Sequence, residues 1–111
     1  MYIAGPRRIV GRPPPKHFPV RTLPRILIVD DNPTNVKVLQ TRLVADGYEV
    51  VTAGDGEEGL AAARRDKPDL ILLDVMMPKL DGFEVCRRLR GDASFPFTPI
   101  IMVTAMADSK D

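Results

Sequence analysis

The sequence has only one cysteine, Cys86, and no tryptophan. A single cysteine excludes an internal disulfide and is typical of a cytoplasmic protein. The longest apolar runs are about five residues, whereas a membrane-spanning helix needs about 20. The amino-terminal part also lacks the continuous apolar stretch of a secretory signal. We therefore expect a cytoplasmic protein without a membrane partner.

The composition is that of an ordinary globular domain. Of the 111 residues, 44% are hydrophobic and 28% are charged, which is enough for one domain with a core of its own. The net charge of +1 conceals an uneven distribution, because residues 1–24 carry five basic side chains and no acidic one. Residues 25–111 therefore carry a net charge of −4.

Residues 1–24 are also rich in proline, with six of the eleven prolines of the chain. Such a segment favours extended geometry over a packed core, and we interpret it as a leader or linker. Its basic charge can attract nucleic acid. However, only Tyr2 and Phe18 lie among these charges as aromatic residues, so we do not expect a nucleic-acid partner.

From Arg25 onwards, short apolar runs alternate with amphipathic segments. The apolar runs are typical of buried strands, and they lie at residues 25–31, 48–53, 70–74 and 99–105. Helices are predicted between them, over residues 32–47, 56–67 and 82–92. This alternation predicts an α/β fold, in which a parallel, doubly wound sheet is connected by right-handed crossovers.

The predicted helices carry terminal signals. Gly47 is expected to end the first of them. Val36, Leu39 and Leu43 recur at helical spacing, so we expect them to form the core-facing side of that helix. The side chains predicted as N-caps of the three helices are Asn32, Asp55 and Asp81.

Carboxylates stand at the ends of the first and third predicted strands. Asp30 and Asp31 end the first, and Asp74 ends the third. Ligands bind at the carboxyl ends of strands in doubly wound sheets, so three carboxylates converge if these strands are neighbours. Two such charges about 4 Å apart repel by roughly 4 kcal/mol at an effective dielectric constant near 20. A raised pKa relieves this repulsion, and so does Mg²⁺, which prefers all-oxygen sites.

The three aspartates, and several other residues near the predicted strand ends and helices, also have a purely structural interpretation. A single aspartate at a strand end is usually a turn or cap residue, but three at two strand ends favour a site. Met76 and Met77 are typical core-filling residues, and we place Cys86 on the buried side of its helix. Thr104, at the end of the fourth strand, is either a strand former or a hydroxyl aimed at the pocket.

Three segments, ILIVDDNPTN, LILLDVMMPKLDGFEVCRRLR and PIIMVTA, resemble the receiver domain of two-component response regulators. The resemblance covers residues 25–111 and implies the flavodoxin-like receiver fold. It also implies that Asp74 accepts a phosphoryl group from the phosphohistidine of a sensor histidine kinase or phosphotransfer protein. The domain is then a signalling module and not an enzyme acting on a separate substrate.

The resemblance assigns further residues to this site. Asp31 and Asp74 are expected to bind Mg²⁺ directly, Asp30 through water, and Met76 through its backbone carbonyl. Thr104 is expected to place its hydroxyl on the phosphoryl group as the switch residue. Pro78 and Gly82 are expected to shape the adjacent loop.

Some parts of the receiver family are absent from this sequence. The family has a fifth strand and two more helices, with a phosphoryl-binding lysine and an aromatic switch residue. We therefore interpret residues 25–111 as a fragment of four strands and three helices with impaired phosphorylation. The output domain or effector is expected to lie outside the chain, and DNPTN and VTAMAD look most like receivers fused to cyclic-nucleotide cyclases. An unpaired fourth strand, residues 99–105, predicts self-association.

Two alternatives remain open. The first is an Mg²⁺-dependent phosphohydrolase with Asp74 as nucleophile, but that class usually has a second acidic residue where this chain has Met76. The second is an interaction module that keeps the fold without being phosphorylated.

Overall fold

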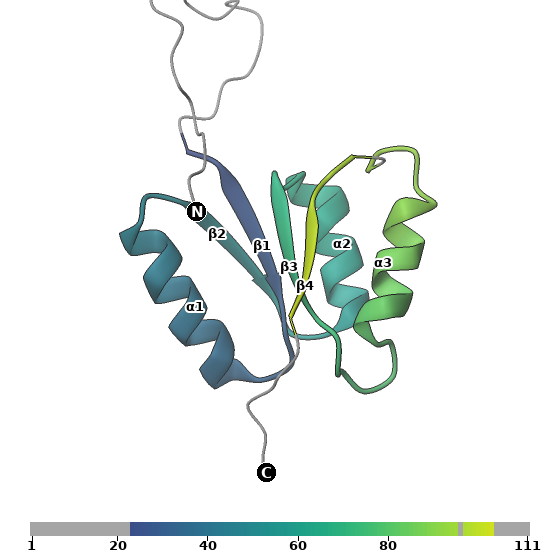
Figure 1. Ribbon diagram of the computed structural model, residues 1–111, viewed down its shortest axis with the longest axis horizontal. Coiled ribbons are helices and arrows are strands. Elements are labelled where there is room, and N and C mark those ends of the chain that lie inside the picture. The colour runs from purple at the N-terminus through teal and green to yellow at the C-terminus, as the bar shows by residue number, and fades with distance from the viewer. Residues whose placement is uncertain (1–22, 96, 104–111) are drawn as a thin grey trace, which may run out of the picture.

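The computed structural model describes residues 23–95 and 97–103. Strands and helices alternate along this part of the chain (Figure 1). The four strands pair in parallel, in the order β2-β1-β3-β4, which confirms the predicted α/β sheet. The elements are β1 (Arg25–Val29), α1 (Pro33–Ala45), β2 (Glu49–Ala53), α2 (Gly56–Asp66), β3 (Leu70–Asp74), α3 (Gly82–Arg90) and β4 (Ile100–Val103).

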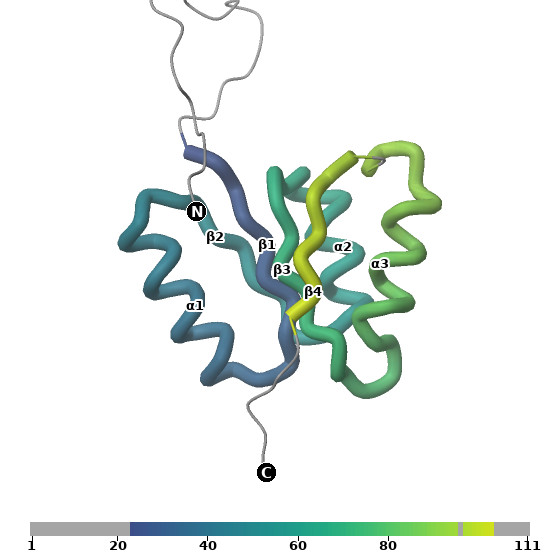
Figure 2. The backbone as a smooth tube through the Cα atoms, in the orientation of Figure 1, coloured from purple at the N-terminus to yellow at the C-terminus, as the bar shows by residue number. Residues whose placement is uncertain are grey.

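Helices lie on both faces of the sheet: α1 on one, and α2 with α3 on the other (Figures 1 and 2). The main core forms between the sheet and the α2–α3 layer. It joins alternate residues of the central strands to the inner sides of both helices, and includes Leu27, Val29, Leu60, Ala63, Ile71, Leu73, Val85 and Leu89. Within the described part of the chain, none of the helices has the length and apolar character needed to span a bilayer.

The opposite face is covered less completely. Helix α1 contacts β1 and β2, but it contains no fully buried residue. Val36, Leu39 and Leu43 are half-buried, so the core-facing side predicted for this helix is only partly formed. The physical reason is that α1 is the single helix on this face among the described elements, and its flanks remain open to solvent.

The predicted helix ends are confirmed. Gly47 follows α1 with a φ of 98°, a left-handed conformation that glycine adopts without steric cost. Lys67 ends α2 in the left-handed region as well, with a φ of 48°, which the sequence did not indicate. Each predicted N-cap accepts a first-turn backbone N–H: Asn32 from Thr34 at 2.9 Å, Asp55 from Glu58 at 2.8 Å and Asp81 from Glu84 at 2.9 Å.

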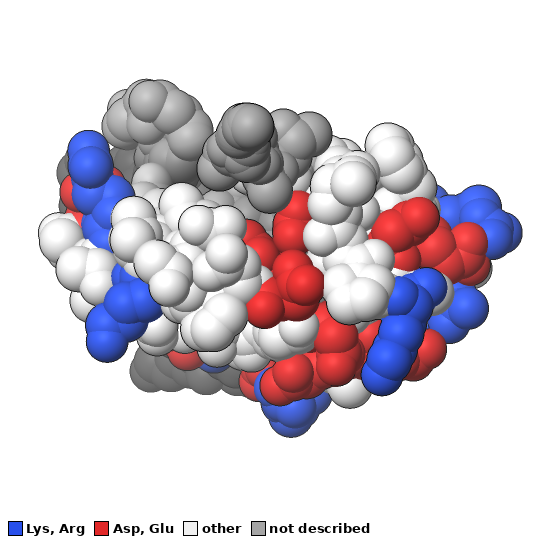
Figure 3. Space-filling view, turned by 90° about the horizontal axis from the view of Figure 1, so that it is seen from below, with Lys and Arg blue, Asp and Glu red and all other residues white. Residues whose placement is uncertain are grey.

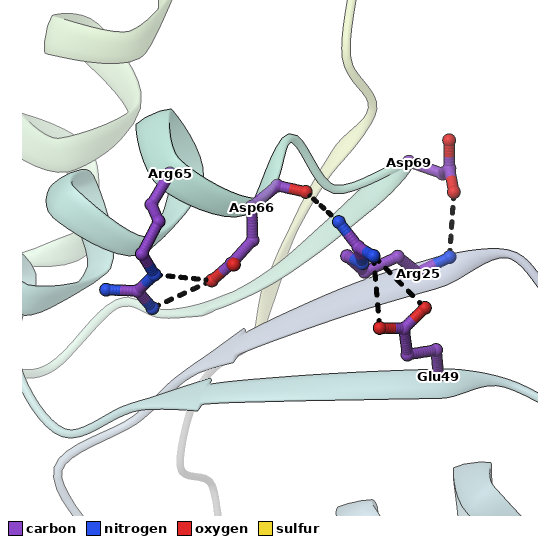
Figure 4. A network of polar contacts seen from close by, with 5 residues as sticks. All are labelled: Arg25, Glu49, Arg65, Asp66 and Asp69. Carbon is purple, nitrogen blue, oxygen red and sulfur yellow. Dashed lines mark hydrogen bonds and ion pairs between the residues drawn. The ribbon is translucent and has the colours of Figure 1, made fainter. Parts of the chain in front are cut away.

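Arg25 connects several segments at the amino-terminal end of the sheet (Figure 4). Its guanidinium lies 3.1 Å from the Glu49 carboxylate of β2 and donates to the backbone carbonyl of Asp66 at the end of α2. The backbone N–H of Arg25 donates to the carboxylate of Asp69 at 2.7 Å. One partly buried side chain therefore joins β1 to β2 and to α2.

Arg25→Met is expected to lower the free energy of unfolding by about 1–3 kcal/mol, because part-buried acceptors lose a charged donor. Urea denaturation measures this loss. The control Arg42→Met removes only an exposed pair with Asp46, and its effect should stay below about 1 kcal/mol. Equal losses in the two variants would contradict a special role for Arg25.

Candidate functional site

The carboxylates predicted to converge do so. β1 and β3 are adjacent and parallel, so Asp30 and Asp31, which follow β1, come close to Asp74 at the end of β3. One carboxylate oxygen of each residue lies within 4.8 Å of the other two. Figure 3, which views the molecule from below, shows acidic side chains gathered at this end of the sheet.

Two of the three carboxylates are buried. Asp74 is 4% exposed and Asp30 is 8% exposed, whereas Asp31 is exposed. The Oδ1 atom of Asp30 accepts the backbone N–H of Asn32 at 2.9 Å, and Oδ1 of Asp74 accepts that of Met76 at 3.1 Å. Both buried carboxylates are therefore oriented by the backbone two residues further on.

Burial raises the pKa of Asp74 from its usual 3.8 to about 6. The backbone N–H of Met76 opposes this rise in pKa, while the charges of Asp30 and Asp31 add to it. At neutral pH, negatively charged carboxylates therefore lie close together at a site that is partly shielded from water. Such a site favours a small divalent cation with oxygen ligands.

The loop between β3 and α3 places the backbone of Met76 next to the acidic cluster. Met77 is 7% exposed and belongs to the core, as predicted, but the side chain of Met76 is 69% exposed. The purely structural interpretation of Met76 as a core-filling residue is therefore wrong. Its backbone N–H turns toward Asp74, while its side chain points into solvent.

Gly82 lies where α3 begins, directly against the backbone of β3. Its N–H donates to the carbonyl of Val75 at 3.0 Å. A Cβ atom added to Gly82 would lie 2.3 Å from the carbonyl oxygen of Asp74, so only glycine fits at this position. The resemblance assigned loop shaping to Gly82, and the structure gives a steric reason for a glycine there.

A groove of ≈ 290 Å³ opens beside the cluster, between α1 and the end of β2. Asp30 and Asp31 line it together with Lys37 of α1 and Thr52 of β2. Asp30 and Asp31 are therefore reached from solvent on the α1 side. A hydrated cation or a small anionic group has room to approach them there.

Thr104 lies outside the described residues, as does the last part of the strand predicted over residues 99–105. Asn32 was predicted only as a helix cap, yet its backbone N–H also orients the Asp30 carboxylate. The spacing of an aspartate two residues before a turn residue is a sequence signal for this contact.

Comparison with known proteins gives consistent matches. The family model described as "Response regulator receiver domain" matches residues 26–111. The response regulator PleD of Caulobacter vibrioides is 54% identical over 82 residues, which are 74% of this chain and 18% of PleD. This chain therefore spans about a fifth of the length of that relative.

Solved structures match over most of the fold. The response regulator TrrA of Thermotoga maritima, solved in complex with Mg²⁺–BeF, has a TM-score of 0.70 and 38% identity, covering 75% of this chain and 70% of that one. The receiver domain of sensor histidine kinase PA1611 of Pseudomonas aeruginosa, with magnesium in its active-site cleft, has a TM-score of 0.72 and 37% identity. That match covers 80% of this chain and 73% of the solved one.

Proposed function

Because this chain belongs to the response regulator receiver domain family of two-component signalling, we propose that Asp74 is its phospho-acceptor. The donor is the phosphohistidine of a sensor histidine kinase or of a phosphotransfer protein. The observation that carries this proposal is the cluster of Asp30, Asp31 and Asp74 at the carboxyl ends of adjacent strands. Asp74 is its most buried member.

The proposed reaction is a transfer between two nucleophiles. A carboxylate oxygen of Asp74 attacks the phosphorus atom, the phosphorus–nitrogen bond breaks, and the histidine nitrogen keeps the electron pair. The product is an aspartyl phosphate. Because the Met76 N–H holds Oδ1 of Asp74, the carboxylate has a defined orientation for this attack.

We propose that Mg²⁺ binds the same cluster, through Asp31 and Asp74 directly, Asp30 through water, and the carbonyl of Met76. The chemistry of these donors fits, since all are oxygens and the three carboxylates lie within 4.8 Å of one another. The bound ion would neutralise the developing charge on the phosphoryl oxygens. Among the relatives, the solved TrrA and PA1611 structures contain magnesium.

The proposal extends to the signal that leaves the site. Thr104, whose structure is not described, is proposed to place its hydroxyl on the phosphoryl group. The added charge then repositions this segment. An output domain or effector outside this chain would read the change, and the setting would be the cytoplasm. We do not propose a phosphohydrolase, because this chain has Met76 at the position where that class usually has a second acidic residue.

Mg²⁺ is expected to stabilise the fold, since a ligand selective for the native state raises the free energy of unfolding. At about ten times its Kd the gain is about 1.4 kcal/mol. This gain should increase from pH 5 to pH 7, because Mg²⁺ must displace the proton that Asp74 holds below about pH 6. Thermal melts at both pH values, with and without Mg²⁺, measure it.

The pKa of Asp74 also sets how the stability of the metal-free chain depends on pH. The folded state binds the Asp74 proton more tightly than the unfolded state does. The stabilisation that comes from this protonation is present below pH 3.8 and is lost as the pH rises through about 6. The matched control for the thermal melts with Mg²⁺ is the double variant Asp31→Ala, Asp74→Ala, whose stability should not change when Mg²⁺ is added. An equal Mg²⁺ shift in that variant would contradict the proposed cation site.

We also propose that the 111-residue chain associates with a second copy through β4. This strand lies at the edge of the described sheet, and Ile101 and Val103 are 46% and 37% exposed. An apolar edge strand is a template for pairing with another chain. Light scattering after size exclusion is expected to show a dimer at micromolar concentration, and Ile101→Lys should shift it to monomer. A wild-type monomer would contradict this proposal.

A further inference from the structure

The loop of residues 75–81 packs against the beginning of α2. The contact is made by Gly56, the first residue of that helix, which is buried. A Cβ atom added to Gly56 would lie 2.8 Å from the carbonyl oxygen of Leu80 and 2.9 Å from Cγ2 of Val85. Contacts this short do not occur for real Cβ atoms, so the loop and α2 approach this closely only because residue 56 has no side chain.

The backbone conformation at residue 56 does not explain the glycine. Gly56 lies within a regular helix, and its φ is outside the left-handed region. The cap is supplied by the neighbouring Asp55, whose Oδ1 accepts the N–H of Glu58 at 2.8 Å. The close packing against Leu80 is therefore the feature that requires glycine here.

The loop has little freedom to absorb a displacement of Leu80. Its two ends are joined by the hydrogen bond between Gly82 and Val75, and Val75 also donates to the carbonyl of Val103 at 3.1 Å. Met77 anchors the middle of the loop in the core, where it is 7% exposed. A push at Leu80 is therefore passed along the loop.

The loop carries the peptide units next to the acidic cluster. Met76 lies in it, and its N–H holds the carboxylate of Asp74 at 3.1 Å. Its carbonyl is the proposed backbone ligand of Mg²⁺. The position of Leu80 against α2 therefore helps to set where this peptide unit lies.

We propose that Gly56 is a positioning residue for the cation site. By allowing α2 to contact Leu80, it holds the loop in the place where Met76 meets Asp74. This inference rests on the proposed function, because the cation concerned is the Mg²⁺ of that proposal. Gly56 acts through the loop and does not touch the cation.

The test is Gly56→Ala in the 111-residue chain. We expect the affinity for Mg²⁺, measured by isothermal titration calorimetry, to fall about tenfold, as for other changes behind a metal ligand. Gly91→Ala is the matched control, because an added Cβ there meets only Arg87 and Arg88 oxygens at 3.6 and 3.7 Å. The affinity of this control should equal that of the wild type.

Two further variants separate positioning from general loss of stability. Arg25→Met weakens the fold at the opposite end of the sheet and should leave the affinity for Mg²⁺ unchanged. Leu80→Ala keeps the carbonyl and Cβ that face Gly56 but removes the rest of a side chain that packs against the core. It therefore loosens the loop by another route, and it keeps the test decisive if Gly56→Ala does not fold. Its affinity for Mg²⁺ should also fall.

A second readout needs no metal. In the metal-free Gly56→Ala chain, the amide chemical shifts of residues 75–81 should change by NMR, while those of β2 stay as in the wild type. Unchanged loop shifts together with wild-type affinity for Mg²⁺ would overturn the role of Gly56. A wild-type chain that binds no Mg²⁺ would instead overturn the proposed cation site.

Discussion

Asp74→Asn is expected to abolish the incorporation of a phosphoryl group from a small acyl phosphate. The neutral amide is a poor nucleophile, and an aspartyl phosphate cannot form without the carboxylate. The experiment uses the chain extended at its carboxyl end to the length of a receiver domain, with Mg²⁺ present. Intact-mass spectrometry counts the phosphorylated fraction, which should be undetectable in this variant.

Asp81→Asn is the matched control. Asp81 has the same side chain and lies in the loop after β3, but its Oδ1 caps α3 by accepting the Glu84 N–H at 2.9 Å. Asparagine keeps this capping oxygen, so phosphorylation should match that of the unsubstituted chain. A phosphoryl group retained in the Asp74 variant, or lost equally in both variants, would refute the assignment of Asp74.

Gly82→Ala should be the most destabilising of these substitutions, lowering the free energy of unfolding by more than about 3 kcal/mol. The added Cβ would lie 2.3 Å from the carbonyl oxygen of Asp74 and 2.8 Å from Cα of Val75. Both atoms belong to the backbone, so neither can rotate away. Relief requires either moving the start of α3 or distorting the end of β3.

Urea denaturation of Gly82→Ala and Gly91→Ala measures the difference. Gly91 also lies at an end of α3, but an added Cβ there meets no atom closer than 3.6 Å. Its variant should stay within about 0.5 kcal/mol of the wild type. A Gly82→Ala chain as stable as this control would show that the loop adapts easily.

Much of the fold was predictable because each element carries its own local signal. The third strand was predicted over residues 70–74, as observed, since its apolar run is bounded on both sides. The first strand was predicted to residue 31 but ends at Val29, because Asp30 already begins the turn. The burial of α1 was overestimated, because periodicity reports which side of a helix is apolar and not how much of the sheet lies beyond it.

The acidic cluster was predictable for a different reason. Asp30, Asp31 and Asp74 come to one edge of the sheet because they lie at the ends of strands that pair in parallel. Both the strand ends and the parallel pairing can be inferred from the alternation of apolar and amphipathic segments. The roles of Arg25 and Gly56 could not be inferred in this way. Each depends on contacts between segments about 24 residues apart, Glu49 for Arg25 and Leu80 for Gly56, for which a single sequence gives no local pattern.

The helices on the two faces of the sheet are unequally buried, so we expect them to differ in how readily they unfold locally. Segments with few buried apolar contacts open locally at lower free energy than a packed core does. We therefore expect helix α1, which has no fully buried residue, to open locally at a lower free energy than the α2–α3 layer. Asp31 lies in the turn just before α1, whereas Asp74 ends β3, whose core residues pack against the α2–α3 layer. Local unfolding of α1 would therefore separate the Asp31 carboxylate from the Asp74 carboxylate while the rest of the domain stays folded.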